Sequence, residues 1–148
     1  MAKAGLTIVG VELSPGLLEQ AAIHFPDVAT EIGDLRALRF DDDSLCGVLS
    51  RHSLIQMPPD DVPIALAEFS RVLAAGAPLF RSFFGTAADQ PHGESFDHQA
   101  ATAYHLDPNV ITDYLERRGF HEIQVTKREP EPTERRQFPR IAILAHRS

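Results

Sequence analysis

The sequence predicts an α/β fold: a mostly parallel, twisted, Rossmann-like sheet with helices on both faces. Short apolar runs alternate with segments of helical period along most of the chain, the pattern of parallel strands joined by helices. Residues 7–11 are almost continuously apolar or β-branched, as in a strand buried on both faces. Two final runs, 121–127 and 138–145, flank a polar turn and predict a C-terminal antiparallel hairpin.

The first half of the chain reads as strand, helix, strand, strand. Ser14 is a favourable N-cap and Pro15 suits the first helical position, so a helix is expected to begin there. A Phe-Pro-Asp triplet ends it. Further strands are expected at about 28–32 and 45–50, with an aspartate-rich turn between them.

The second half adds two helices around a fourth strand. A Pro-Pro-Asp-Asp run at 58–61 opens a helix that is expected to end at Gly76, where a left-handed glycine relieves the last carbonyls. The strand is expected at 78–84. Asp107 then caps a helix that reaches Arg118.

Residues 85–105 show neither helical nor strand periodicity. A connection of this length in a compact domain is usually functional or disordered. We therefore expect a variable loop that covers the substrate as a lid. A chain of 148 residues without internal repeats fits a single domain over 1–148.

Composition narrows the classes of partner. Asp and Glu number 21 against 14 Lys and Arg, and the net charge of −7 argues against a sequence-independent grip on nucleic acid. No apolar run approaches the roughly 20 residues of a membrane helix, and the start lacks the apolar stretch of a signal peptide. Cys46 is the only cysteine and is expected to be an inert core residue. A reduced, cytoplasmic compartment and no membrane are the default expectations.

Two polar groupings are interpreted as solvated loops. A basic cluster near the C-terminus is interrupted by glutamates, and its members are Lys127, Arg128, Arg135, Arg136 and Arg140. The residues His92, Glu94, Asp97 and His98 share one loop without the helical or hairpin spacing that converges metal ligands. We therefore predict neither an anionic partner nor a metal.

Several motifs follow one another in a fixed order. They are Gly-Val-Glu-Leu-Ser-Pro at 10–15, Gly-Asp-Leu-Arg-Ala-Leu at 33–38 and the strand and loop at 47–58. An Arg-Val-Leu-Ala-Ala-Gly run at 71–76 and the helix at 108–119 come after them. Together they resemble class I S-adenosylmethionine-dependent methyltransferases over nearly the whole chain. In that family the first three segments are the second, third and fourth strands with the loops that follow.

The resemblance implies S-adenosylmethionine as cofactor and assigns residues to it. Glu12, followed by Leu13, takes the place of the acid that accepts hydrogen bonds from the ribose hydroxyls, and a carboxylate has lone pairs for two vicinal hydroxyls. Asp34 takes the place of the acid that meets the adenine amine. The backbone N–H of Leu35 would then reach a ring nitrogen.

Further residues are expected near the methionine moiety and the transferable methyl. Ser50 and Arg51 either line the cofactor or only terminate a strand. His52 is the titratable group nearest the expected methyl position, and an imidazole suits proton transfer near neutrality. His105 would face the substrate. The alternatives are an oriented loop histidine for His52 and a helix-entry role for His105.

The sequence departs from the family pattern at its start. A first strand and a D/E-x-G-x-G-x-G loop are expected before residue 7, and residues 1–6 contain neither. The run at 7–12 fits the family's second strand, because no glycine triplet follows Glu12. The resemblance therefore implies an N-terminally truncated domain with unpaired inner strand edges. The sheet then closes over the gap, forms a homodimer through these edges, or is marginally stable.

The activity implied is methyl transfer from S-adenosylmethionine to an oxygen, nitrogen or carbon of a small molecule. The sulfonium is already activated, so the protein mainly aligns the reacting atoms. Two alternatives stay open. One is a non-catalytic Rossmann-like remnant or assembly module that has lost the cofactor cradle, and the other is a shortened form of an ordinary enzyme.

Overall fold

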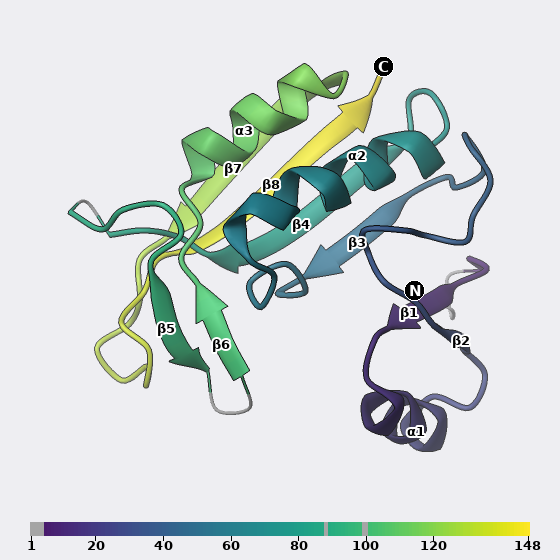
Figure 1. Cartoon of the computed structure of the whole chain (residues 1–148), viewed down its shortest axis with the longest axis horizontal. Coiled ribbons are helices and arrows are strands. Elements are labelled where there is room, and N and C mark those ends of the chain that lie inside the picture. The colour runs from purple at the N-terminus through teal and green to yellow at the C-terminus, as the bar shows by residue number, and fades with distance from the viewer. Residues whose placement is uncertain (1–4, 88, 99–100) are drawn as a thin grey trace. The chain divides into compact units, whose positions relative to one another are not determined.

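Two structural units make up the chain (Figure 1). The computed structural model describes residues 5–87, 89–98 and 101–148. One unit is Met1–Arg39 and the other is Phe40–Ser148.

The N-terminal unit is a β–α–β element. β1 (Val9–Glu12) and β2 (Ala29–Ile32) pair in parallel, with Glu12 opposite Ile32, and α1 (Pro15–His24) connects them. Ser14 caps α1 as predicted: its Oγ accepts a hydrogen bond from the N–H of Leu17 at 3.5 Å.

The expectation of a first strand buried on both faces is wrong for this unit. Val9 is 43% exposed, and α1 has no buried side chain. The reason is size, because two four-residue strands and one helix are too few elements to enclose a strand.

A four-stranded sheet forms the centre of the C-terminal unit. Its order is β3 (Val48–Arg51), β4 (Pro78–Phe84), β8 (Arg140–Arg147) and β7 (Phe120–Arg128). β3 and β4 are parallel, whereas β8 runs antiparallel to both β4 and β7. The α/β class and the C-terminal hairpin are thus confirmed.

The helices of this unit share one face of the sheet (Figure 1). They are α2 (Val62–Val72), entered through a 3₁₀ turn at Pro59–Asp61, and α3 (Pro108–Arg117), capped by Asp107 as predicted. Taken alone, the unit therefore lacks the expected helices on the second face. The core lies between helices and sheet and includes Leu66, Phe69, Leu79, Phe83, Ile111, Leu115, Ile141, Ile143 and Ala145.

The second face of this sheet is less covered. Alternate residues of the strands point toward it, and the register places Leu49 beside Phe80 and Leu144, and Ser82 between Arg51 and Ala142. Leu49 and Phe80 are exposed. This open face matters below because it carries a cavity.

Helix α2 ends earlier than predicted. The last helical residue is Val72, and Leu73 is extended because it forms a parallel bridge with Leu45. The N–H of Ala74 donates to the carbonyl of Leu45 at 2.9 Å. Gly76 does have a left-handed φ of 77°, but it turns the chain toward β4 instead of closing the helix.

Residues 85–105 were expected to lack regular structure, and that expectation is wrong. β5 (Ser95–His98) and β6 (Ala101–Tyr104) pair antiparallel, with Phe96 opposite the buried Ala103. Strands of four residues give too short an alternation to be distinguished from a loop. Residues 88, 99 and 100 of this segment lie outside the described residues.

Cys46 is exposed, so its expected place in the core is also wrong. β3 begins only at Val48, and Cys46 precedes the strand. No helix in the described ranges is long and apolar enough to cross a membrane.

Arg81 places an unneutralised charge in the core. The residue is only 1% exposed, and no described residue accepts a hydrogen bond from its Nε or Nη1. Its guanidinium carbon lies 4.6 Å from the centroid of the Phe83 ring. Burial lowers the pKa of Arg81 to about 9. A desolvated cation–π contact contributes about 2 kcal/mol, less than the several kcal/mol that burying a cation costs.

We therefore expect Arg81→Met to raise the free energy of unfolding by about 1–4 kcal/mol at pH 7. Methionine fills a similar volume without a charge. Urea denaturation measures the change, and Arg117→Met, at the exposed end of α3, is the control with an expected change within about 0.5 kcal/mol. A loss of stability in Arg81→Met would contradict the view that this charge is uncompensated.

Candidate functional site

Glu12 ends β1 and is held by the turn that follows the strand. Its Oε1 accepts a hydrogen bond from the N–H of Ser14 at 2.9 Å, and the side chain is half-buried. Its second carboxylate oxygen has no partner among the described residues. Glu12 is therefore oriented by one oxygen and open to a ligand through the other.

Asp34 lies two residues beyond β2, at the same end of the parallel pair as Glu12. Gly33 lets the chain after β2 pass close to β1, because a Cβ at this position would lie only 2.6 Å from Cγ1 of Val11. The Asp34 carboxylate binds Arg36 through the backbone N–H at 2.9 Å, Nε at 3.0 Å and Nη2 at 2.6 Å. Hydrogen bonds from Arg36 lower the pKa of Asp34. The Arg36 side chain therefore competes with a ligand for this carboxylate.

The two leucines beside these acids differ in exposure. Leu13 is exposed, whereas Leu35 is half-buried. The N–H of Leu35 makes no hydrogen bond with another described residue, so it is free to donate. The structure thus brings Glu12, Asp34 and Leu35 together at one end of the N-terminal unit.

Ser50 and Arg51 are the last two residues of β3, and their environments differ. Ser50 is buried, and its Oγ lies 2.7 Å from Oγ of Ser53, so it helps to close the turn after the strand. Arg51 is exposed and lies beside Ser82 of β4 on the open face.

His52 has a strained backbone and an imidazole without a hydrogen-bond partner. Its φ is 54°, uncommon for a residue with a side chain, and its N–H donates to the carbonyl of Ser82 at 2.8 Å. The ring is half-buried, 4.8 Å from the Phe84 ring, and Nδ1 has no partner among the described residues. Burial, then the charges of Arg51, Arg140 and His98, lower the pKa of His52. The imidazole is therefore neutral at pH 7 and able to accept a proton.

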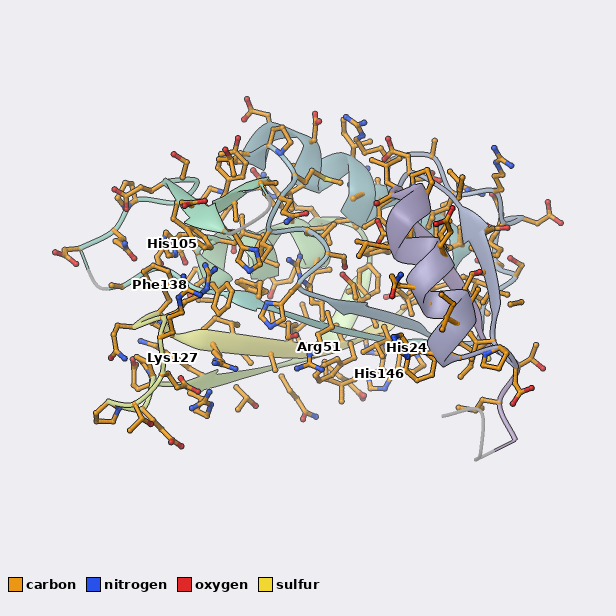
Figure 2. All side chains as sticks on the ribbon, turned by 90° about the horizontal axis from the view of Figure 1, so that it is seen from below. His24, Arg51, His105, Lys127, Phe138 and His146 are labelled. Atoms are coloured by element: carbon orange, nitrogen blue, oxygen red, sulfur yellow. The ribbon has the colours of Figure 1, made fainter. Side chains whose placement is uncertain are left out.

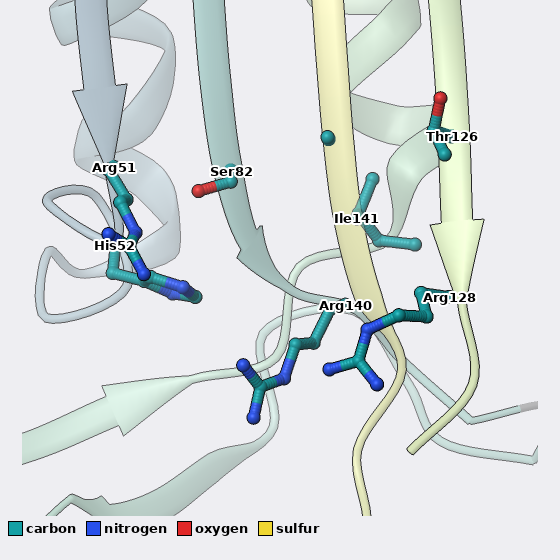
Figure 3. A pocket seen from close by; sticks show the side chains of 8 residues that line it. Arg51, His52, Ser82, Thr126, Arg128, Arg140 and Ile141 are labelled. Carbon is teal, nitrogen blue, oxygen red and sulfur yellow. The ribbon is translucent and has the colours of Figure 1, made fainter. Parts of the chain in front are cut away.

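A cavity of about 230 Å³ opens beside His52 (Figure 3). We call it the arginine cavity, because the end of β3, the start of β8 and the end of β7 each contribute an arginine to it. In Figure 3 the side chains of Arg128 and Arg140 lie near the ends of β7 and β8, and those of Arg51 and His52 lie at the end of β3. The lining residues are Arg51, His52, Ser82, Thr126, Arg128, Arg140, Ile141 and Ala142.

One carboxylate partly balances these charges. Oε1 of Glu134 accepts from Nη2 of Arg128 at 2.7 Å and lies 3.0 Å from Nη2 of Arg140. Arg51 forms no ion pair with any described residue. Nε of Arg140 is buried without a hydrogen-bond partner. The cavity therefore keeps an excess of positive charge in a chain whose net charge is −7.

His105 lies in an aromatic cluster and does not line the arginine cavity. It is 1% exposed, and its Nδ1 is 3.2 Å from the carbonyl oxygen of Gly85. Its ring lies 4.4 Å from the Phe96 ring and 4.3 Å from the Phe138 ring. Figure 2 labels His105 and Phe138. Burial lowers the pKa of His105. This placement matches a packing role better than the expected contact with substrate.

The sequence alone missed the place of Arg128 and Arg140 beside this cavity. Both were assigned to a solvated loop, yet they are cross-strand partners at the ends of β7 and β8. The signal was the hairpin itself, since a correct register would have placed them opposite each other. No set of three or more His, Cys, Asp or Glu in the described ranges is arranged to hold a metal.

Replacing Arg51 by Gln should raise the pKa of His52. In the unaltered chain we expect this pKa below 6.5, and in Arg51→Gln nearer to, but still below, that value, because burial is the larger cause. NMR titration of the imidazole resonances measures both. Lys127→Gln removes a charge that pairs with Glu129 outside the cavity and is the control. Equal shifts in the two variants would contradict a local effect of Arg51.

Comparisons with known proteins add a family and a fold. A family model described as a methyltransferase domain matches residues 1–76. No curated protein sequence matches the chain.

Three solved structures illustrate the likeness of fold. An S-adenosylmethionine-dependent methyltransferase from Methanosarcina mazei is 18% identical with a TM-score of 0.80, over 99% of this chain and 84% of its own. The 1,6-didemethyltoxoflavin-N1-methyltransferase of Burkholderia thailandensis, solved with 1,6-didemethyltoxoflavin and S-adenosylhomocysteine, is 16% identical with a TM-score of 0.76, over 99% and 64%. The cyclase SpnF is 14% identical with a TM-score of 0.78, over 96% and 67%.

Proposed function

Because the chain belongs to the methyltransferase domain family, whose model its residues 1–76 match, we propose that it transfers a methyl group from S-adenosylmethionine to a small molecule. The observation that best supports this is the place of Glu12 at the carboxyl end of β1. In parallel α/β sheets, ligands bind outside the carboxyl ends of the strands, and an acid there binds ribose hydroxyls.

The residues of the N-terminal unit fit the nucleoside part of this cofactor. The unpaired oxygen of Glu12 accepts from ribose hydroxyls, while Ser14 holds the other oxygen in place. The free N–H of Leu35 donates to a ring nitrogen of adenine. Asp34 would accept from the adenine amine in competition with Arg36.

The residues of the C-terminal unit serve the acceptor. When bound, S-adenosylmethionine would supply a methyl group activated by its sulfonium, and the neutral thioether S-adenosylhomocysteine would be the leaving group. The neutral imidazole of His52 takes a proton from the acceptor, and Nδ1 has no competing partner among the described residues. The β5–β6 ribbon contacts the same region, because the Phe96 ring lies 6.0 Å from the Phe84 ring that packs on His52. We assign residues 85–105 to the lid over the acceptor.

Other expectations stay predictions. They are a single domain over residues 1–148, dimerisation through open strand edges and the absence of nucleic-acid binding. A non-catalytic Rossmann-like module is the alternative function, and one observation favours it: both oxygens of the Asp34 carboxylate already accept hydrogen bonds from Arg36.

Calorimetric titration with S-adenosylhomocysteine tests the proposal on the full chain. We expect micromolar binding, with about 10- to 100-fold weaker binding in Glu12→Ala, because hydrogen bonds to a charged group are lost. Glu19→Ala, on the exposed surface of α1, should bind like the unaltered chain. If the chain does not bind although circular dichroism shows that it is folded, the methyltransferase proposal is wrong and the non-catalytic module becomes the proposed function.

Removing Arg36 should strengthen the same binding. Arg36→Ala releases the Asp34 carboxylate, and the loss of an exposed ion pair should lower the Kd by about two- to fivefold. Asp34→Asn should weaken binding, and the gain from Arg36→Ala should vanish in the double variant. Arg39→Ala is the control. A gain that persists without the Asp34 carboxylate would contradict its contact with adenine.

A further inference from the structure

We propose that the arginine cavity binds an anionic group, a carboxylate or a phosphate, carried by the methyl acceptor. That this anionic group belongs to a methyl acceptor rests on the proposed function. The anion site itself rests on the residues that line the cavity.

The first argument is the placing of like charges. Arg128 and Arg140 are directly opposite each other in the β7–β8 ladder, an arrangement that destabilises a sheet unless an anion lies between the charges. Glu134 supplies only one oxygen to the two guanidinium groups. Arg51 adds another positive charge from β3 (Figure 3). The cavity thus holds more positive charge than Glu134 neutralises.

The second argument is the set of unsatisfied polar atoms. Nε of Arg140 and Nδ1 of His52 are buried, and neither has a hydrogen-bond partner among the described residues. Buried polar atoms without partners are rare in native proteins and call for a ligand or water. An oxyanion supplies the acceptor that the Nε–H of Arg140 lacks, and Nδ1 of His52 stays open for the proton of the methyl acceptor.

The third argument concerns shape and neighbours. Ser82 and Thr126 bring hydroxyl groups to the cavity, and both can donate to an anion oxygen. A volume of about 230 Å³ is below the roughly 300–1,000 Å³ typical of sites that enclose a whole ligand. It therefore suits one functional group, while the rest of the acceptor stays outside.

The position of His52 connects this site to the chemistry. His52 lines the cavity and is the proposed proton acceptor. An acceptor anchored by its anionic group would present its nucleophile near this imidazole. Anchoring by paired guanidinium groups is geometrically specific, because each presents a planar fork of donors to an oxyanion.

Phenyl phosphate, benzoate and the neutral benzyl alcohol are the probes, titrated into the full chain while backbone NMR signals are followed. The titrations are run with and without saturating S-adenosylhomocysteine. We expect the two anions to shift the amide signals of Arg51, His52 and Arg140, with or without S-adenosylhomocysteine, and benzyl alcohol to leave them unchanged.

Four variants locate the site. Arg140→Gln and Arg51→Gln should each weaken phenyl phosphate binding by about tenfold, and the exposed Arg51 makes the second variant safe for folding. Glu134→Gln should tighten binding, because it frees Arg128 and Arg140 for the ligand. Arg117→Gln, on α3, is the matched control and should bind like the unaltered chain.

Three results would overturn the inference. They are no binding of either anion, equal binding of benzyl alcohol, and loss of anion binding when S-adenosylhomocysteine is present, since the last would assign the cavity to the cofactor's own carboxylate. Failure of the methyltransferase proposal is seen separately, as absent S-adenosylhomocysteine binding. Anion binding that depends on Arg140 in such a chain would keep the anion site and remove only its link to methyl transfer.

Discussion

The pairing of β4 with both of its neighbours is the constraint on which the C-terminal unit depends. β4 is parallel to β3 on one side and antiparallel to β8 on the other, in a register that sets Ser82 beside Arg51 and Ala142. Leu79 and Phe83 then face the helices, while Ser82 faces the arginine cavity. A slip of one residue would exchange the two faces along the whole strand. The core and the cavity are therefore set by the same hydrogen-bond ladder.

Two features around the arginine cavity carry a cost in stability. His52 holds a left-handed backbone where β3 ends, and such strain persists only where surrounding structure enforces it. Here the enforcing contact is its N–H bond to the carbonyl of Ser82. Arginines gather at the ends of three strands although the chain as a whole is acidic. Strain and like charge in one place are typical of binding sites rather than of packing.

Fold and function rest on different evidence in this protein. Structural neighbours with identities of 14–18% show the architecture, and they include both methyltransferases and a cyclase. One fold supports several chemistries, so a shared architecture does not by itself assign a reaction. The argument for methyl transfer rests on the family match over residues 1–76 and on the Glu12 carboxylate, of which only one oxygen accepts a hydrogen bond from a described residue.

The sequence by itself determined the features that local signals encode. Ser14 and Asp107 marked the starts of α1 and α3, and the acids at the ends of the first two strands marked the candidate cofactor residues. Each signal depends on neighbours within a few positions along the chain. The family assignment followed from the order of such local motifs.

Only the tertiary structure decided what depends on register and packing. It converted part of the expected loop into the β5–β6 ribbon, ended α2 at Val72 through the bridge to Leu45, and left Cys46 exposed. It also gathered Arg51 and the hairpin arginines around one cavity. The physical reason is that the partner of a strand residue lies on another strand, from 7 positions away for Phe96 and Ala103 to 60 for Ser82 and Ala142. Local periodicity says which residues alternate, but not which ones meet.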